Sequence, residues 1–308
     1  MNSELDFTNS DLVFKPEVAF ALAKEQPIVA LESTVISHGL PRPVNLKTAL
    51  EMEEAVRQNG AIPATIAILD GVPRIGLTES QLEFLANEDN IYKISLRDLP
   101  VAVTCKLNGS TTVAASAFFA RQAGIQVFAT GGIGGIHRES AFDVSADLPA
   151  LSRTPITVVC AGAKSVLDLP ATREWLETFG ICVLGFQTNE LPAFYSRQSN
   201  LKVDARVETA AQAVEIIRTR DRLKLENAIL LTVPVPAEFE IPSMKLEGYL
   251  RSALQKAKTS NIGGKTLTPF LLNEINEESN GATVRANVAL LTQNAQIAAQ
   301  VARLISEA

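Results

Sequence analysis

Three short apolar runs constrain the fold of this chain most strongly. They lie at 126–130, 156–160 and 181–186, and each has the length of one buried strand. Between the second and third runs, Asp168-Leu169-Pro170 opens a helical stretch that Gly180 ends. A strand, a helix and a strand in this order are typical of a parallel sheet, because a parallel connection must cross back over the sheet.

Weaker patterns fill in the rest of the architecture. Further strands are expected at 28–31, 64–69 and 227–233, with 72–77 as the second arm of a hairpin after the Asp70-Gly71 turn. Helices are expected at 45–59 with Asn45 as cap, after Thr78, at 111–123 behind a polar turn at 108–110, and near 244–258, 268–278 and 283–305. The fold class that follows is α/β, a three-layer α/β/α arrangement with a mainly parallel central sheet and a helical C-terminal portion. We expect residues 1–308 to form a single domain with a flexible N-terminus at 1–14.

Charge and composition exclude several classes of function. The chain has 34 acidic and 28 Lys or Arg residues and a net charge of -6, so a nucleic acid polymer is repelled at long range. No apolar run approaches the roughly 20 residues of a membrane helix. The polar, acidic start lacks the pattern of an export signal, and three cysteines without a Cys-x-x-Cys pair favour a reducing compartment. We therefore expect a cytoplasmic protein that binds neither membranes nor nucleic acid polymers.

Polar, glycine-containing loops follow three of the expected strands. Glu32-Ser33-Thr34 and then His38-Gly39 follow the first, residues 131–138 follow the second, and residues 161–165 follow the third. Ligands of parallel sheets bind beyond the carboxyl ends of the strands. The three loops therefore predict one shared site at this edge of the sheet.

The glycine run Gly131–Gly135 has two interpretations of equal weight. Closely spaced glycines allow main-chain N–H groups to approach an anion, and they also serve a tight crossover turn. A dinucleotide site is disfavoured, because His137 stands where the fingerprint needs its third glycine.

Lys164 and Glu32 are the candidate catalytic residues. Lys164 follows a buried strand and three small residues, where its amine could attack a carbonyl carbon. Glu32 follows another strand and could act as a general acid if burial raises its pKa. Taken singly, a lysine that pairs with phosphate or solvent and a carboxylate in an ion pair are the commoner roles.

Acidic and basic residues elsewhere give weaker signals. Asp143 and Asp147 would share one face if their segment were helical, and carboxylate oxygens suit Mg²⁺ or Mn²⁺. Two acids at the start of a helix that complement its dipole are the alternative. Lys93 and Arg97 are candidate phosphate contacts or part of a solvated face. Asn287 is a weak candidate on the last helix.

Taken together, the sequence resembles the pseudouridine-5′-phosphate glycosidase (pseudouridylate synthase) family, which is related to indigoidine synthase A. The resemblance runs in family order from about residue 15 to 305. It is carried by VALEST at 29–34, PATIAI at 63–68, RDLP at 97–100, NGSTTV at 108–113, FATGGIGGIHR at 128–138, DVSADL at 143–148, VVCAGAKS at 158–165 and TPFLL at 268–272. The segment between His137 and Asp143 is slightly shorter than in relatives.

The resemblance implies an activity and a set of roles. The activity is reversible cleavage of pseudouridine 5′-phosphate to uracil and ribose 5-phosphate, with a sugar–lysine imine as intermediate. Glu32 corresponds to the proton donor, Lys164 to the nucleophile and Asp143 to the acid that binds Mn²⁺ or another hard cation such as Mg²⁺. Substrate contacts are implied at Lys93, Thr112, Val113, Thr130, His137, Ser145, Ala146, Asp147 and Asn287. A homotrimer is also implied.

Two other functions fit parts of the same pattern. A class I aldolase or another imine-forming phosphosugar lyase would keep Lys164 and the phosphate loop. A phosphosugar-binding regulator would keep Lys93 and the glycine loop but would need neither Glu32 nor Lys164. Release of uracil from pseudouridine 5′-phosphate, and its loss in Lys164→Ala, separates the three.

Overall fold

A twisted sheet forms the centre of the computed structural model, which describes residues 11–138, 140–263 and 266–307. Its strand order is β1-β4-β3-β2-β7-β10-β14-β12-β13, with β6 also on β3 and β5 on β6. The strands are β1 (Val13–Phe14), β2 (Ile28–Leu31), β3 (Ile62–Leu69), β4 (Val72–Ile75), β5 (Tyr92–Ile94), β6 (Gly109–Thr111), β7 (Val127–Ala129), β10 (Thr157–Cys160), β12 (Cys182–Phe186), β13 (Ala205–Val207) and β14 (Ile229–Thr232).

The part of the sheet from β3 to β13 is parallel, and the antiparallel pairs are confined to β4 and β6 beside β3. Residues of β2, β10 and β14 are all buried, as expected for strands covered on both faces. A small antiparallel sheet, β11-β8-β9, stands apart from the central one. It consists of β8 (Ile136–His137), β9 (Ser140–Val144) and β11 (Leu167–Asp168).

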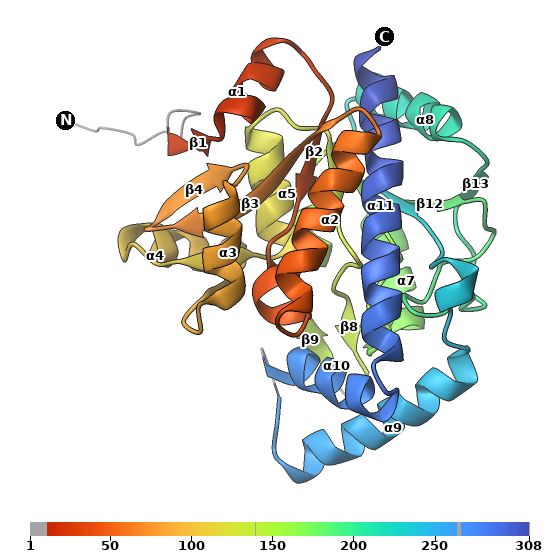
Figure 1. The fold of residues 1–308 in the computed structure, drawn as a ribbon. Helices are drawn as coiled ribbons and strands as arrows, with labels where there is room; N and C mark the ends of the chain where they lie inside the picture. Colours follow the sequence, from red (N-terminus) through yellow and green to blue (C-terminus); the bar gives the residue numbers. More distant parts are fainter. Residues whose placement is uncertain (1–10, 139, 264–265, 308) are drawn as a thin grey trace.

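Helices cover both faces of the central sheet (Figure 1). On one face α2 (Val44–Gln58), α8 (Ala210–Arg222) and the long α11 (Ala282–Ser306) pack together. On the other lie α5 (Val113–Gln122), α6 (Asp147–Leu151) and α7 (Leu169–Thr178). The remaining helices are α1 (Pro16–Ala23), the π-helix η2 (Val35–Gly39), α3 (Glu79–Asn87), η3 (Leu96–Asp98), α4 (Leu99–Thr104), η4 (Ala237–Phe239), α9 (Ser243–Thr259) and α10 (Leu267–Glu278).

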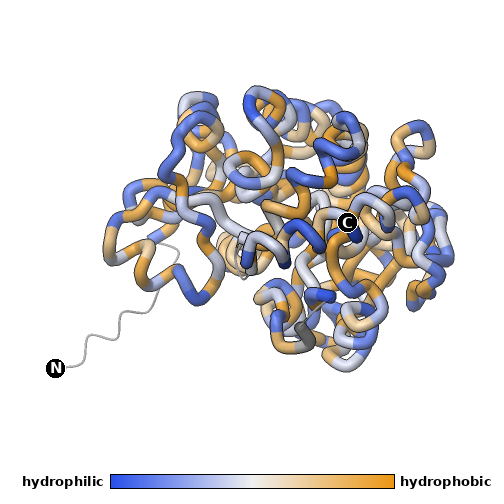
Figure 2. Tube along the Cα trace, turned by 90° about the horizontal axis from the view of Figure 1, so that it is seen from below, coloured by the Kyte–Doolittle hydropathy of each residue, from blue (hydrophilic) through white to orange (hydrophobic). Residues whose placement is uncertain are grey.

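The C-terminal helices give the helical portion that the sequence predicts. Helices α9 and α10 lie side by side across one end of the molecule, next to the β8–β9 hairpin (Figure 1). Hydrophobic and hydrophilic residues are mixed along the whole trace (Figure 2). In α9 the buried residues Leu246, Leu250, Ala253 and Ala257 are three or four positions apart, which gives the helix one buried face. No helix in the described ranges is both long and apolar enough to cross a membrane. The three-layer α/β/α prediction is confirmed.

Several local predictions are wrong. The expected polar turn at 108–110 contributes to β6, because its residues pair with β3 and β5. Asn45 lies inside α2, and its side-chain amide donates to the carbonyl oxygens of Ile36 and Ala86 instead of capping the helix. Residues 1–10 of the expected flexible segment 1–14 lie outside the described residues, so this prediction is untested there. The last two residues of the segment form β1 against β4, where Leu12 is also buried.

The strand–helix–strand unit is present, with one difference from the simplest version. Helix α7 connects β10 to β12 in parallel, yet β14 lies between these two strands and pairs with both. Strand β14 enters from much later in the chain, so the local pattern of 156–186 could not reveal its position.

Glu53 of α2 has a buried carboxyl that faces β3, and it gives a test of the packing between this helix and that strand. Its Oε1 accepts a hydrogen bond from Oγ1 of Thr65 at 2.6 Å. Burial raises the pKa of Glu53 above its ordinary 4.5, and the Thr65 bond and nearby Lys15 and Arg57 oppose this only in part. Between the unfolded pKa of about 4.5 and the higher folded pKa, the folded state therefore binds more protons than the unfolded chain. The free energy of unfolding falls as the pH rises through this interval.

We expect Glu53→Gln to be more stable than the native chain at pH 8 and to lose that advantage below the unfolded pKa of about 4.5. Glutamine keeps the acceptor for Thr65 without a charge that burial penalises. Urea unfolding at several pH values between 4 and 8 measures the difference. Glu54→Gln, one residue further along α2 and exposed, is the control. A Glu53→Gln variant with the same pH dependence as the native chain would contradict the prediction.

Candidate active site

The strand register brings Glu32 and Thr130 together at the carboxyl edge of the sheet. Leu31 of β2 is level with Ala129 of β7, so the next residue of each strand lies at the same height. Thr130 donates a hydrogen bond from Oγ1 to Oε1 of Glu32. Both side chains are buried. Burial raises the pKa of Glu32, while the nearby Lys164 charge and the Thr130 bond act in the opposite direction.

The residues after Glu32 are fixed to the neighbouring strands. Ser33 donates from Oγ to the carbonyl oxygen of Ile66 at 2.6 Å, and Thr34 donates from Oγ1 to that of Thr111 at 2.8 Å. The main-chain N–H of Thr111 donates to Oγ of Ser33 at 2.9 Å. These bonds hold the start of the loop rigidly, so the Glu32 carboxyl has a defined direction into the site.

Asp147 joins the glycine loop to the start of α5. Its Oδ1 accepts the N–H of Ala114 at 3.0 Å, and its Oδ2 accepts the N–H of Gly134 at 2.8 Å. A Cβ at Gly134 would lie 2.1 Å from Oγ of Ser145, so only glycine fits this approach. The carboxylate thus spans two segments that are 20 residues apart in sequence.

The position of Asp147 corrects the helical interpretation of the two acids. Asp143 lies on β9, whereas Asp147 is the first residue of α6. The two therefore do not share one helical face. Asp147 lines the cavity as expected, but both of its oxygens already accept main-chain hydrogen bonds.

Lys164 enters the site from the loop after β10. Its N–H donates to the carbonyl oxygen of Ile133 at 3.1 Å, and Ile133 in turn donates to that of Gly162 at 3.0 Å. Main-chain hydrogen bonds therefore join this loop to the glycine loop beside it. Gly162 adopts a φ of +83°, and a Cβ there would lie 2.1 Å from the carbonyl oxygen of Pro192. The small residues before Lys164 are needed for this close packing.

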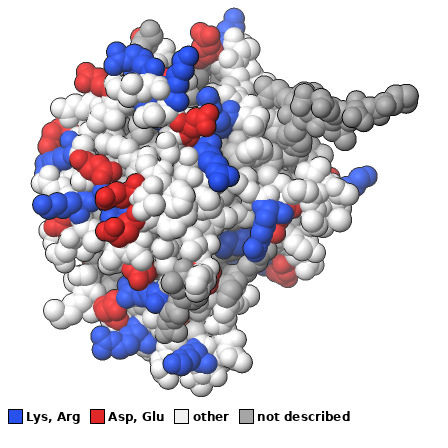
Figure 3. Space-filling view, turned by 180° about the vertical axis from the view of Figure 1, so that it is seen from behind, with Lys and Arg blue, Asp and Glu red and all other residues white. Residues whose placement is uncertain are grey.

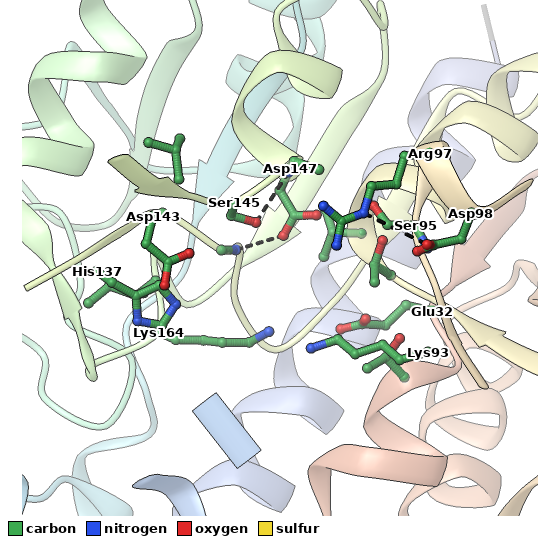
Figure 4. A pocket seen from close by; sticks show the side chains of 18 residues that line it. Glu32, Lys93, Ser95, Arg97, Asp98, His137, Asp143, Ser145, Asp147 and Lys164 are labelled. Atoms are coloured by element: carbon green, nitrogen blue, oxygen red, sulfur yellow. Dashed lines mark hydrogen bonds and ion pairs between the residues drawn. The ribbon is translucent and has the colours of Figure 1, made fainter. Parts of the chain in front are cut away.

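The cavity at this edge has a volume of about 460 Å³. In Figure 4 the amines of Lys164 and Lys93 extend toward each other in front of the Glu32 carboxyl, although the two lysines come from opposite walls. Lys164 follows β10, whereas Lys93 lies on β5. A phosphorylated substrate of moderate size fits this volume and charge.

His137 and Asp143 form a pair on another wall of the cavity. They lie on β8 and β9 of the small sheet, and their side chains are adjacent in Figure 4. Burial lowers the pKa of His137, the Asp143 carboxylate raises it, and the positive charges of Lys93 and Lys164 lower it further. The imidazole is therefore expected to be neutral near pH 7.

A second, smaller cavity, which we name the inner chamber, shares Glu32, Thr34, Lys93 and Lys164 with the main one. It is also lined by Val35, His38, Gly39, Gly131, Gly132, Phe194, Leu272 and Asn287. Lys164 therefore lies where the two spaces meet. Asn287 comes from α11, and Leu272 from α10, so the C-terminal helices complete the site.

The structure brings the residues implied by the resemblance into these two spaces. The main cavity is lined by Glu32, Lys93, Thr112, Val113, His137, Asp143, Ser145, Ala146, Asp147 and Lys164. Asn287 lines the inner chamber, and Thr130 lies behind Glu32. Thr34 and His38 belong to a loop that the sequence placed at the site without giving them individual roles, whereas Ser95, which also lines the main cavity, was not predicted. His38 follows Glu32 within one loop, and this proximity was the available signal.

The described side chains of the cavity limit the kind of cation site that could form there. Among the described residues, no group of three or more His, Cys, Asp or Glu side chains could hold a metal ion. Mg²⁺ and similar hard cations often use one or two carboxylates and complete their shell with water and substrate phosphate. Asp143, which faces the cavity, fits such an open site and not an all-protein cage.

The outer surface offers no strong attraction for a polymer. On the face in Figure 3, acidic and basic side chains of the described residues are interspersed, with no continuous field of one sign. Inside the cavity, Lys93, Arg97 and Lys164 share the lining with four acids, Glu32, Asp98, Asp143 and Asp147. A small ligand bound there would meet both signs of charge within one space.

Removing one Asp147 oxygen should weaken the fold around the site. In Asp147→Asn an amide –NH₂ faces one main-chain N–H, so that donor is left buried without an acceptor. We expect a loss of about 1–3 kcal/mol in the free energy of unfolding, measured by denaturant titration. Asp143→Asn, on the other wall, should stay within about 0.5 kcal/mol of the native chain. Equal stabilities for Asp147→Asn and the native chain would refute this role of Asp147.

Known proteins with similar sequences cover nearly the whole of this chain, including all the residues of the site. Residues 17–304 match the family described as "Indigoidine synthase A like protein". A pseudouridine-5′-phosphate glycosidase of Caldanaerobacter subterraneus subsp. tengcongensis is 50% identical over 288 residues, which are 93% of this chain and 94% of that protein. A pseudouridine-5′-phosphate glycosidase of Staphylococcus aureus is 48% identical, with 96% of each chain covered.

Solved structures with this fold extend the comparison. An indigoidine synthase A-like protein from Thermotoga maritima is 36% identical with a TM-score of 0.88, and 96% of each chain is covered. The prealnumycin C-glycosynthase AlnA, in complex with ribulose 5-phosphate, is 36% identical with a TM-score of 0.89 over 96% of this chain and 97% of its own. From its sequence motifs, its fold and these matches, the chain belongs to the indigoidine synthase A-like family, which includes the pseudouridine-5′-phosphate glycosidases.

Proposed function

We propose that this chain reversibly cleaves the carbon–carbon glycosidic bond of pseudouridine 5′-phosphate, giving uracil and ribose 5-phosphate. The observation that carries the proposal is the meeting of the Lys164 amine and the buried Glu32 carboxyl in one cavity. Relatives named for this activity share 47–50% of their residues with the chain over nearly its whole length. A relative with bound ribulose 5-phosphate supports a pentose 5-phosphate as ligand.

The chemistry explains why an acid and an amine are needed together. Pseudouridine joins C1′ of the sugar to C5 of uracil, and a carbon leaving group departs poorly. Glu32 donates a proton to the ring oxygen of the sugar as the bond from that oxygen to C1′ breaks. Burial raises the pKa of Glu32, which favours the protonated acid that this step requires.

Lys164 then provides the covalent step. In its neutral form the amine forms a bond to C1′ and releases a proton. When C5 of uracil gains a proton, the electrons of the C1′–C5 bond go to C5, and the nitrogen lone pair forms the imine with C1′. Water hydrolyses the imine to free Lys164 and ribose 5-phosphate. The intermediate divides one difficult step into easier ones.

The remaining cavity residues hold the substrate. Lys93 is assigned to the 5′-phosphate, with Thr112, Val113 and the 145–147 segment as further contacts on the same side. A phosphate anchored away from C1′ contributes binding energy that orients the reacting carbon. Asn287 and Thr130 are assigned to the side on which the base lies.

A hard divalent cation, Mn²⁺ or Mg²⁺, is proposed at Asp143. The fit rests on a carboxylate that faces the cavity beside an imidazole kept neutral by burial. When bound, the cation would supply positive charge for the substrate phosphate. A homotrimer and a cytoplasmic location are part of the same proposal, because they accompany the activity in the family that the sequence resembles.

The covalent step has a direct test. Incubation with ribose 5-phosphate and borohydride should leave a sugar-phosphate adduct, and peptide mass spectrometry should place it on Lys164 and not on Lys93. Lys164→Ala and Lys164→Arg should release no uracil from pseudouridine 5′-phosphate, because neither side chain readily forms the imine. An adduct on another lysine, or an active Lys164→Arg enzyme, would overturn the mechanism.

The cation site is tested separately. Asp143→Ala should lose the response of uracil release to added Mn²⁺ and most of its activity, since one carboxylate provides the protein's charge at the site. Glu247→Ala, an exposed acid on α9 that does not line the cavity, should keep the native response. Full activity with an unchanged Mn²⁺ response in Asp143→Ala would rule out this assignment.

A further inference from the structure

The inner chamber contains two buried polar atoms that the described residues leave without hydrogen-bond partners. They are Nε2 of His38 and Oδ1 of Asn287. Both residues line the chamber beside Lys164, together with the apolar side chains of Phe194 and Leu272. Buried polar atoms in folded proteins are nearly always paired, so unpaired ones in a cavity point to a ligand. The chamber alone has a volume of about 40 Å³ and shares Glu32, Thr34, Lys93 and Lys164 with the main cavity, so a flat ring that enters it would extend from the main cavity.

His38 is held in this position by an unusual backbone segment. It lies in the π-helix η2, directly after the Glu32 loop, and such segments are rare and frequently found at functional sites. Asn45 provides the main anchor of the segment, because its amide donates to the carbonyl oxygens of Ile36 at 2.9 Å and of Ala86 at 3.0 Å. Ser37 adds one hydrogen bond from Oγ to the carbonyl oxygen of Leu85 at 3.0 Å, and the two Asn45 bonds do not depend on it.

The surroundings of His38 also determine the protonation state and the tautomer of its imidazole. Burial lowers the pKa of His38 and the charge of Lys93 lowers it further, while hydrogen bonds to the main chain at Ile91 and Tyr92 act in the opposite direction. The ring is therefore neutral near pH 7. The nitrogen that bonds to the main chain carries the proton of a neutral ring, so Nε2 is left as an acceptor.

We propose that His38 recognises the base, with its Nε2 accepting a hydrogen bond from a ring N–H of uracil. The inference rests on the proposed function, because it takes the occupant of the chamber to be the departing base. In a carbon-linked uracil nucleotide both N1 and N3 carry hydrogen, whereas in uridine N1 carries the sugar. Two acceptors, Nε2 of His38 and Oδ1 of Asn287, match a base with two N–H donors. His38 thus selects carbon-linked over nitrogen-linked uracil nucleotides.

The two half-reactions allow a clean test. Imine formation with ribose 5-phosphate needs no base, whereas synthesis of pseudouridine 5′-phosphate needs uracil. We would compare the native enzyme with His38→Phe, His38→Gln and the control Ser37→Ala, which alters the same π-helix without touching the chamber. Borohydride trapping measures the first half-reaction. Initial rates with saturating ribose 5-phosphate and varied uracil, 1-methyluracil or 3-methyluracil measure the second.

The expected result separates recognition from folding. His38→Phe should trap ribose 5-phosphate on Lys164 as well as the native enzyme does, yet its KM for uracil should rise at least tenfold. His38→Gln, which keeps an acceptor, should recover part of that loss, and Ser37→Ala should resemble the native enzyme. The native enzyme should discriminate against at least one methylated uracil, and His38→Phe should lose this discrimination.

Three results with the variants would overturn the inference. The first is an unchanged KM for uracil in His38→Phe, and the second is an equal loss in His38→Phe and Ser37→Ala. The third is loss of adduct formation in both His38 variants, which would indicate a structural role. Failure of the native enzyme to form an adduct with ribose 5-phosphate would refute the proposed function itself and the inference with it. A native adduct with unselective use of the methylated bases would refute the inference alone.

Discussion

The site depends on the carboxylate of Asp147. Its two oxygens accept main-chain N–H groups of Ala114, at the start of α5, and of Gly134, in the glycine loop. The glycine loop in turn accepts the N–H of Lys164 through the carbonyl oxygen of Ile133. A chain of hydrogen bonds therefore runs from α5 through the glycine loop to the main chain of Lys164. Because each bond joins main chain or a buried carboxylate, the positions of the reacting groups are set by the backbone and not by mobile side chains.

Charge inside the cavity is balanced over a short range. The amines of Lys93 and Lys164 extend toward one another in front of Glu32. Without the Glu32 carboxyl, this approach of two like charges would be unfavourable. Glu32 provides a negative charge when ionised, and burial raises its pKa so that a proton is also held readily. A phosphorylated substrate adds negative charge to the same space. The cavity thus contains both signs of charge, with three cations and four acids in its lining, and an anion would be bound locally by the lysines in a chain whose net charge is -6.

Much of this could be predicted from the sequence, because parallel strands have continuous apolar runs and their following loops meet at one edge. Glu32, the glycine loop and Lys164 were placed together on that basis, and the structure confirms their convergence. The interval from His137 to Asp147 could not be predicted, because the short strand β8 pairs with β11 and β9, and these three strands form a sheet separate from the central one. Nor could the position of β14 between β10 and β12, since that pairing joins segments about 70 residues apart.

The sequence placed His38 in a loop of the predicted site but gave it no individual role. It stands six residues after Glu32, a spacing that puts two residues on different faces of an α-helix. In the structure the loop continues into η2, and Glu32 and His38 line the same inner chamber. Phe194 and Leu272 close this chamber from segments far along the chain. Lys164 lines both this chamber and the main cavity, so under the proposed function a sugar carbon bound there would have the main cavity on one side and the unpaired acceptors on the other. The two halves of the substrate would then be held by different parts of the fold, with the bond to be broken between them.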